Sequence, residues 1–510
     1  MTSPARRSVR PALALVPALV GVFIAADDQT VMVTILPQVM HDLKVQVTEL
    51  DRASWTITGY LLGYLVGIPL IGRLSDSWGH RRLFVLSMLG FMVGSVAVAI
   101  TPVVNESLLA PRMSAEDAQR WTLWWLVGTR VFQAVGAGAM VPISIAMAGD
   151  LFPPGRRALP LGMIGAAAEA GGVIGPLWGG LFVRYLDWTW VFWINVPLGL
   201  AVIVAMMVLV APSPRYATRV DFTGGALLAV SLATLTLGLA RIGSPDGLLV
   251  AYAVVAAATF AAFVARQRTT EHPLLPVAMF RSWAFTAASA THLLVGAALI
   301  IAMVTIPLMA NTALALTPLE GGLRLMRMTV GIPVGAVLGG LACQWLDYRV
   351  PAVAGLALAA LGFVLMSGWD IQIAEPALTI HLAIAGLGFG LLIAPIALSA
   401  TETVGEENRG TGAATVTAMR IVGMTLGLAA LTAWGSDRFQ SLVSGISLPF
   451  ALPEDTAAQS QQRVEEFDSQ LRDAGMDLFS EFFLIAAGLC VLAVATATFM
   501  AWSRRRAEER

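Results

Sequence analysis

The sequence predicts an all-α integral membrane protein with fourteen transmembrane helices, arranged as two six-helix bundles plus two extra helices. Three observations predict this fold class. The chain has 510 residues, of which 57% are hydrophobic and only 13% are charged, and its mean hydropathy of +0.75 lies outside the range of soluble proteins. Apolar runs long enough to cross a bilayer recur along it. In lipid, runs of this length can satisfy their backbone polar groups only as helices.

Fourteen apolar runs can be counted, each bounded by charges, glycine or proline. Each is therefore expected to form one transmembrane helix. The runs lie near residues 14–40, 52–72, 83–104, 121–144, 159–183, 190–211, 222–242, 248–266, 284–310, 319–343, 350–369, 378–400, 411–435 and 480–502.

Polar connections divide these runs into three groups. The segment APSPRYATR follows the sixth run, and RQRTTEHPLLP precedes the ninth. We therefore expect an N-terminal six-helix bundle at 1–211, two linker transmembrane helices at 212–270, and a C-terminal six-helix bundle at 271–510. The last bundle includes an outer loop at 436–479, whose sequence fits either a helical hairpin beyond the membrane or an irregular loop.

A faint internal repeat supports the two bundles. GRLSDSWGHRR at 72–82 and GLACQWLDYRV at 340–350 occupy corresponding places after the second helix of each bundle, although Gln344 stands where Asp76 does. Similarity between halves is typical of transporters in which two bundles rock about a central site.

The arginines predict the orientation. With both termini in the cytoplasm, nineteen arginines lie inside and nine lysines and arginines lie outside, as the positive-inside rule requires. Four further arginines lie within the spans: Arg130, Arg324, Arg327 and Arg420. Charges at that depth need a partner or a function.

The fifth run contains an unusual stretch, GMIGAAAEAGGVIGPLWGG, from Gly162 to Gly180. At helical spacing, one stripe collects Gly162, Gly165, Glu169, Gly172, Pro176 and Gly180. Small residues allow membrane helices to approach closely. The stretch therefore indicates either tight packing with one snorkelling acid, or a conformational hinge that carries a titrating group.

Features of soluble catalysis and of metal binding are missing from the sequence pattern. Cys343 and Cys490 are far apart and indicate neither a disulfide framework nor a metal site. We find no histidine-rich metal cluster, no glycine-rich phosphate loop and no nucleophile–base pair. We therefore expect no enzyme activity, no cofactor other than a proton gradient, and no nucleic-acid partner.

Four motifs, in order along the chain, resemble those of the major facilitator superfamily. DQTVMVTILP begins at Asp28, GRLSDSWGHRR at Gly72 and RVFQAVG at Arg130, and the fourth motif is the Gly162–Gly180 stretch. The first resembles the fourteen-helix drug:proton antiporter family. Further pieces resemble a subgroup of mycobacterial multidrug and triacylglycerol exporters: Tyr60–Tyr64, GAAAEAG around Glu169, Val191–Pro197, Arg420 with Gly423 and Met424, and Leu431–Trp434.

The resemblance implies roles for particular residues. Asp28, Glu169 and Arg420 would work together in proton coupling, with Arg130 and Gln133 lining the cavity or relaying the proton. A conformational latch would be made by Gly72, Asp76, Gly79, Arg81 and Arg82, because an acid near a helix end can meet the N-terminal dipole of a neighbouring helix. A hinge would be made by Gly162, Gly171, Gly175, Pro176, Gly179 and Gly180.

Arg324 and Arg327 lie three residues apart and so on one helical face. They are expected either to snorkel to the outer headgroups or to line a lateral lipid entrance or outer vestibule.

The spans also indicate the kind of substrate. They are rich in methionine, phenylalanine and alanine and poor in hydroxyl and amide groups, whereas a polar solute needs several convergent donors and acceptors. We expect a monomeric, proton-driven exporter of lipids such as triacylglycerols, or of multiple drugs, in the bacterial inner membrane. An extracytoplasmic lipid-carrier protein is a further expected partner. The alternatives are a transporter of a polar metabolite and a membrane enzyme or sensor that does not transport.

Overall fold

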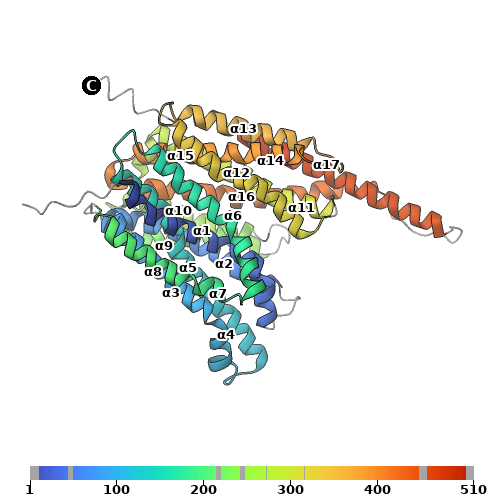
Figure 1. The fold of residues 1–510 in the computed structure, drawn as a ribbon, viewed down its shortest axis with the longest axis horizontal. Coiled ribbons are helices and arrows are strands. Elements are labelled where there is room, and N and C mark those ends of the chain that lie inside the picture. Colours follow the sequence, from blue (N-terminus) through green and yellow to red (C-terminus); the bar gives the residue numbers. More distant parts are fainter. Residues whose placement is uncertain are drawn as a thin grey trace, which may run out of the picture.

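The computed structural model describes residues 11–43, 50–213, 220–239, 241, 247–271, 273–314, 316–446 and 457–500. Within these ranges every regular element is a helix, and fourteen helical segments are long and apolar enough to cross a membrane. The predicted fold class is therefore confirmed, and the long helices lie side by side as one bundle (Figure 1).

The helices follow the predicted runs closely, with several extended at one end. The part of the chain before the linker forms α1 (Pro11–Asp42), α2 (Leu50–Trp78), α3 (His80–Ala99), α4 (Thr101–Val104), α5 (Ala115–Leu151), α6 (Ala158–Tyr185), α7 (Trp190–Trp193) and α8 (Asn195–Leu209), with a π-helical turn at Asn105–Leu109. The linker forms α9 (Phe222–Leu239) and α10 (Gly247–Thr269).

The remaining part of the chain forms α11 (Trp283–Thr312), α12 (Pro318–Ala342), α13 (Arg349–Ser367), α14 (Ala377–Leu391), α15 (Ile393–Glu402), α16 (Arg409–Val443) and α17 (Ala457–Thr498), with 3-10 turns at Val277–Arg281 and Glu406–Asn408. We call α1–α8 the N half and α11–α17 the C half. The latch end of the bundle is the end that holds Asp76, Asp150 and Arg409, and the hairpin end is the opposite one, where α16 ends and α17 begins.

Local sequence signals define where several helices begin. The Ser114 side chain accepts a hydrogen bond from the Asp117 amide at the start of α5. Thr317 and Glu320 form a reciprocal capping box at the start of α12, where Pro318 occupies the first turn. These residues satisfy backbone amides that have no partner within the helix.

Helix α6 makes its closest approach to α1 through Gly171, Gly175 and Gly179. A Cβ atom at Gly175 would lie 2.6 Å from the Asp27 carbonyl oxygen, and one at Gly171 would lie 3.0 Å from the Asp27 amide nitrogen. These glycines repeat every four residues and so form one face. Only glycine permits backbones to come this near.

The stripe predicted from the sequence is therefore only partly correct. Gly162 and Gly165 do pack tightly, but a Cβ atom at Gly172 or Gly180 would meet only a threonine methyl group at 3.9 Å, and Pro176 is exposed. The difference arises because α6 contacts several neighbours along its length. Its first turns face α12 and α15, whereas its later turns face α1 on a different side.

The two halves meet at the latch end through two corresponding glycines. Gly72 on α2 packs against Gly410 and Ala414 of α16, and Gly340 on α12 packs against Ala158 and Leu159 of α6. The internal repeat noted in the sequence thus occupies two similar seams between the halves. At the position of Asp76, the second copy has Gln344.

The segment 436–479 is largely helical where the structure describes it. Helix α16 continues to Val443, and α17 begins at Ala457 and runs for 42 residues, so that it extends well beyond the other helices (Figure 1). Arg438 donates to Glu481 at 2.5 Å between the two helices. The described part of this segment is therefore helical rather than irregular, and α17 alone projects beyond the end of α16.

We expect Gly175→Ala to destabilise the protein by about 1–3 kcal/mol, since the added methyl group overpacks the α1–α6 contact. Gly172→Ala is the matched control, because a methyl group there meets only the Thr30 methyl group at an ordinary van der Waals distance of 3.9 Å. Melting temperatures of both variants in detergent, read by tryptophan fluorescence, check this expectation. Equal shifts in the two variants would contradict it.

Candidate functional site

Asp28 on α1 lies in a buried polar cluster. Its Oδ2 accepts a hydrogen bond of 2.6 Å from Arg130 on α5, and its Oδ1 accepts from Gln133 at 3.0 Å and from Asn195 at 3.1 Å. The side chains of Asp28 and Arg130 are 1% and 0% exposed. A pair of charges at this depth is tolerable because its charges and its hydrogen bonds are both matched.

Arg130 is fixed from several sides. It donates to the Gln133 side chain at 2.7 Å and to the Asp28 carbonyl oxygen at 3.2 Å. Its guanidinium carbon lies 4.2 Å from the ring centre of Tyr60, a distance suited to a cation–π interaction. The structure thus brings Arg130 and Gln133 directly onto Asp28.

Two members of this cluster were missed from the sequence. Ser95 on α3 accepts from Gln133 at 2.8 Å and from Asn195 at 3.3 Å, and Asn195 opens α8. A lone amide at the start of an apolar run was the available signal for Asn195. Ser95 gives no such signal, because a serine in a membrane helix usually bonds its own backbone.

Asp27 lies beside this cluster but outside its hydrogen-bond network. It is 8% exposed, and its Oδ1 atom has no hydrogen-bond partner in the described part of the chain. The two adjacent acids therefore differ. Asp28 is paired with Arg130, whereas Asp27 has no arginine partner among the described residues.

Glu169 and Arg420 form an ion pair between the halves. Arg420 on α16 donates to Glu169 on α6 at 2.5 Å, and the two side chains are 24% and 16% exposed. A small cavity of about 70 Å³ adjoins them, lined by residues that include Ile145, His292 and Val416. The pair therefore spans the interface between the N half and the C half.

The three predicted coupling residues thus form parts of two separate ion pairs. Asp28 is paired with Arg130 within the N half, and Glu169 is paired with Arg420 across the halves. Tyr60 and Tyr64 on α2 lie between them, with ring centres 6.4 Å apart. Tyr60 faces Arg130, and Tyr64 is within electrostatic reach of Glu169 and Arg420.

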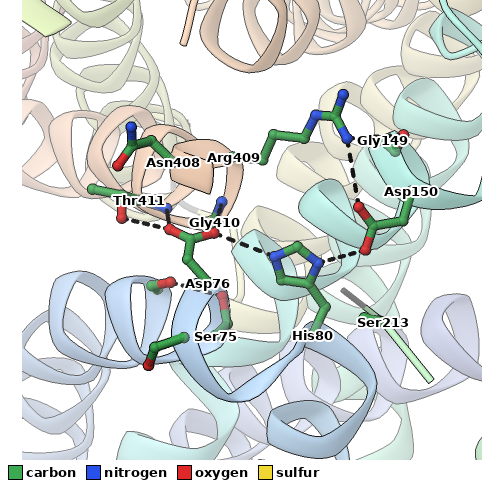
Figure 2. Close-up of polar contacts among 12 residues, drawn as sticks. Ser75, Asp76, His80, Gly149, Asp150, Ser213, Asn408, Arg409, Gly410 and Thr411 are labelled. Carbon is green, nitrogen blue, oxygen red and sulfur yellow. Dashed lines mark hydrogen bonds and ion pairs between the residues drawn. The ribbon is translucent and has the colours of Figure 1, made fainter. Parts of the chain in front are cut away.

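At the latch end, the Asp76 carboxylate caps the start of α16 (Figure 2). It accepts hydrogen bonds from the Gly410 amide at 2.7 Å, from the Thr411 amide at 2.9 Å and from the Thr411 hydroxyl at 2.7 Å. The amides of a first helical turn have no partner within the helix and carry a partial positive charge. Asp76 therefore joins α2 of the N half to α16 of the C half.

A second set of contacts surrounds this cap (Figure 2). His80 lies between Asp76 and Asp150, at 3.3 Å and 2.7 Å from their carboxylate oxygens. Arg409 reaches from α16 to Asp150 at 3.5 Å and to the Gly149 carbonyl oxygen at 3.3 Å. His80, Asp150 and Arg409 were not singled out from the sequence, because their contacts join helices that are distant in the chain.

The other predicted latch residues have supporting places. Gly79 has a φ of 89°, which allows the tight turn between α2 and α3 and favours glycine. Arg81 donates to the Val210 carbonyl oxygen at 2.7 Å and so fixes the end of α8. Arg82 lies over the Trp78 ring. Gly72 gives α16 room to approach, as described above.

Arg324 and Arg327 lie near the start of α12, and they differ. Arg327 is paired with Glu375 and also donates to Thr379 at 2.8 Å. Arg324 donates to the Glu320 carbonyl oxygen at 3.4 Å. The sequence did not indicate Glu375 as a partner. Because Arg327 has these two protein partners, it depends less on lipid headgroups than a snorkelling arginine without partners would.

An apolar groove of about 660 Å³ lies between the linker helices and the α2–α16 seam. Its lining includes Pro69, Leu232, Phe260, Phe263 and Met419. The part of the chain that the structure describes has no group of three or more His, Cys, Asp or Glu side chains that could hold a metal ion.

Sequence comparisons with known proteins indicate the family of this chain. The family model of the Major Facilitator Superfamily matches residues 18–428. A triacylglyceride transporter of Mycolicibacterium hassiacum is 35% identical over 96% of this chain and 92% of its own length. A probable triacylglyceride transporter of Mycobacterium leprae is 32% identical over 96% of each chain.

Solved structures share the fold. The proton:xylose symporter XylE matches with a TM-score of 0.63 at 14% identity, covering 96% of this chain and 95% of its own. The human organic anion transporter MFSD10 matches with a TM-score of 0.58 at 13% identity, covering 96% and 100%. The family match and the transporter relatives indicate a membrane transporter and not an enzyme. The family match and the full-length relatives, together with fourteen candidate membrane helices in the described residues, show that the chain belongs to the major facilitator superfamily.

Proposed function

We propose that this protein is a proton-coupled exporter of lipids such as triacylglycerols, working by alternating access in the bacterial inner membrane. The observation that carries the proposal is the buried carboxylate of Asp28, held by Arg130 inside a membrane bundle whose halves are joined by separable polar contacts. Both chain termini lie in the cytoplasm, and the latch end faces it, because arginines are concentrated at that end. The protein acts as a monomer.

Asp28 is the primary proton carrier in this proposal. Its charge is tolerated only while Arg130, Gln133 and Asn195 surround it. A movement that withdraws Arg130 leaves the carboxylate uncompensated, and binding a proton then removes the charge. Protonation from outside and release to the cytoplasm would therefore follow the change in partners.

The contacts between the halves define the state of the transporter. Asp76, with the start of α16, and Arg409, with Asp150, hold the latch end closed. Glu169 and Arg420 form a further contact between the halves, partly accessible to water. Opening toward the cytoplasm requires these contacts to break, and Glu169 can then accept a proton or a new partner.

The substrate class rests on two supports. Relatives over nearly the full length are named triacylglyceride transporters, and the large groove beside the α2–α16 seam is lined almost entirely by apolar side chains. Hydrocarbon chains need volume and apolar contact, whereas a polar metabolite needs convergent hydrogen-bonding groups. Helix α17 projects at the hairpin end (Figure 1), where an extracytoplasmic lipid-carrier protein would dock.

Asp28→Asn is expected to slow proton-driven lipid export by about tenfold or more, because asparagine cannot carry the proton that couples transport. Proteoliposomes containing labelled triacylglycerol, with an imposed proton gradient, measure this rate. Asp42→Asn on the same helix is the matched control, since Asp42 lies at the hairpin end with His41 and Gln38. Coupled export at the wild-type rate in Asp28→Asn would refute the role.

The same vesicles distinguish the substrate classes. A panel of triacylglycerol, phospholipid, hydrophobic dyes and a labelled sugar should show gradient-dependent movement of triacylglycerol. Movement of the dyes alone would replace lipid export with multidrug export. Movement of the sugar alone would favour a polar metabolite.

Asp76→Asn is expected to lower the ratio of closed to open latch ends by about tenfold, because the charged acceptor at the start of α16 is lost. Spin labels are attached at Arg156→Cys and Trp345→Cys, and electron–electron resonance measures the distance between them. The closed latch end gives a short distance and the open one a long distance, and their relative populations give the ratio. Both sites are exposed and lie at the latch end on opposite halves. Cys343 and Cys490 are replaced in this background. The exposed acid Glu271 supplies the control, Glu271→Gln, which should leave the ratio unchanged.

A further inference from the structure

We propose that His80 is a proton-binding site that controls closure of the latch end, separate from the coupling acids Asp28 and Glu169. This inference rests on the alternating access proposed above. It concerns the residues drawn in Figure 2, where the imidazole ring lies between two carboxylates.

The geometry requires two N–H donors on the ring. Nδ1 of His80 is 2.7 Å from Asp150 Oδ2, and Nε2 is 3.3 Å from Asp76 Oδ1. Ionised carboxylates only accept hydrogen bonds, a neutral imidazole has one N–H, and an imidazolium has two. Both contacts are therefore satisfied only when His80 holds a proton. Rotating the ring by half a turn would bring carbon atoms to both carboxylates in place of the nitrogens, so the two hydrogen bonds support the ring orientation described.

Each of these carboxylates also contacts the opposite half. Asp76 accepts from the first turn of α16, and Asp150 accepts from Arg409. His80 thus contacts both carboxylates from within the N half. It holds each of them in position to accept hydrogen bonds from the C half. The ring is 1% exposed, so water cannot replace a hydrogen bond that it loses while the latch is closed.

The direction of the effect follows from this placement. Loss of the proton leaves a ring lone pair facing one carboxylate at hydrogen-bond distance, which is repulsive in a buried site. That carboxylate then turns away and loses its alignment with α16 or with Arg409. When the halves separate, water can hydrate the neutral ring. Proton binding by His80 therefore favours the closed latch, and a rise in pH favours the open one.

Other charges near the ring do not reverse this balance. Arg409 on α16 opposes a proton on His80, but it is paired with Glu406 at 2.7 Å. Arg73 on α2 donates to Asn408 at 2.6 Å, and Arg81, next to His80 on α3, is directed to the end of α8. Arginine keeps its charge at all relevant pH values, whereas histidine changes charge near neutrality. His80 can therefore make this latch depend on cytoplasmic pH.

The test uses the full-length protein in lipid nanodiscs with spin labels at Arg156→Cys and Trp345→Cys. The ratio of closed to open latch ends is measured from about pH 6 to about pH 8.5, across the range in which histidine titrates. In the wild type we expect this ratio to fall about tenfold, the effect of losing one hydrogen bond to a charged group.

Three variants isolate the contribution of His80. His80→Gln should remove most of the pH dependence and leave the latch mainly open, because glutamine is neutral at every pH in the range and has both of its N–H groups on one nitrogen, whereas the ring reaches the two acids from two nitrogens. His80→Arg, if it folds, should keep the latch closed across the range. Asp150→Asn, which removes the negative charge beside the ring, should shift the midpoint to lower pH. His41→Gln, at the hairpin end, is the matched control and should retain the wild-type pH dependence.

The outcomes separate this inference from the function on which it rests. A wild-type pH dependence that persists in full in His80→Gln would overturn the role of His80, since the titrating acids are the same in both proteins. An unchanged midpoint in Asp150→Asn would also contradict it. A single distance at every pH in all variants would instead contradict alternating access itself.

Discussion

The hydrogen bonds from the first turn of α16 to the Asp76 carboxylate are the interaction on which the described conformation depends. They use backbone amides that no other group in the helix can satisfy, so they join the halves without adding a cation to the interface. The surrounding contacts reinforce this cap: Arg409 reaches back to Asp150, and Gly72 lets α16 approach closely. The closed latch end is thus a consequence of where α16 begins.

The charges of the coupling residues within the bundle are also matched by partners. Asp28 with Arg130, and Glu169 with Arg420, are matched pairs in which each partner makes the other tolerable in lipid. The first pair is internal to the N half and the second crosses between the halves. A rigid rocking motion can therefore break the second pair directly, whereas it affects the first only by rearranging helices α1 and α5. The two stacked tyrosines of α2 lie between the pairs, with Tyr60 against Arg130 and Tyr64 within electrostatic reach of Glu169 and Arg420.

The sequence predicted much of this fold because hydrophobic length and turn residues are local signals. The fourteen spans and the placement of Asp76 next to a loop could both be read from neighbouring residues. Which acid meets which arginine could not, since Asp28 and Arg130 are separated by about a hundred positions and pairing depends on how helices cross. The glycine stripe of α6 was partly misassigned for the same reason: periodicity identifies faces but not the neighbour that each face meets.

Helix α17 has a mechanical consequence. Its 42 residues give a length of about 63 Å at the α-helical rise per residue, in one unbroken rod. Ser480 and Thr496 bond it to α13 and α11 near its middle and end, and Arg349 bonds to the backbone just after it. The rod must turn with the C half as a lever arm. In the proposed alternating access, a small rotation of the C half would become a larger sweep of the projecting part of α17, so the reach of the protein beyond the membrane would depend on which side is open.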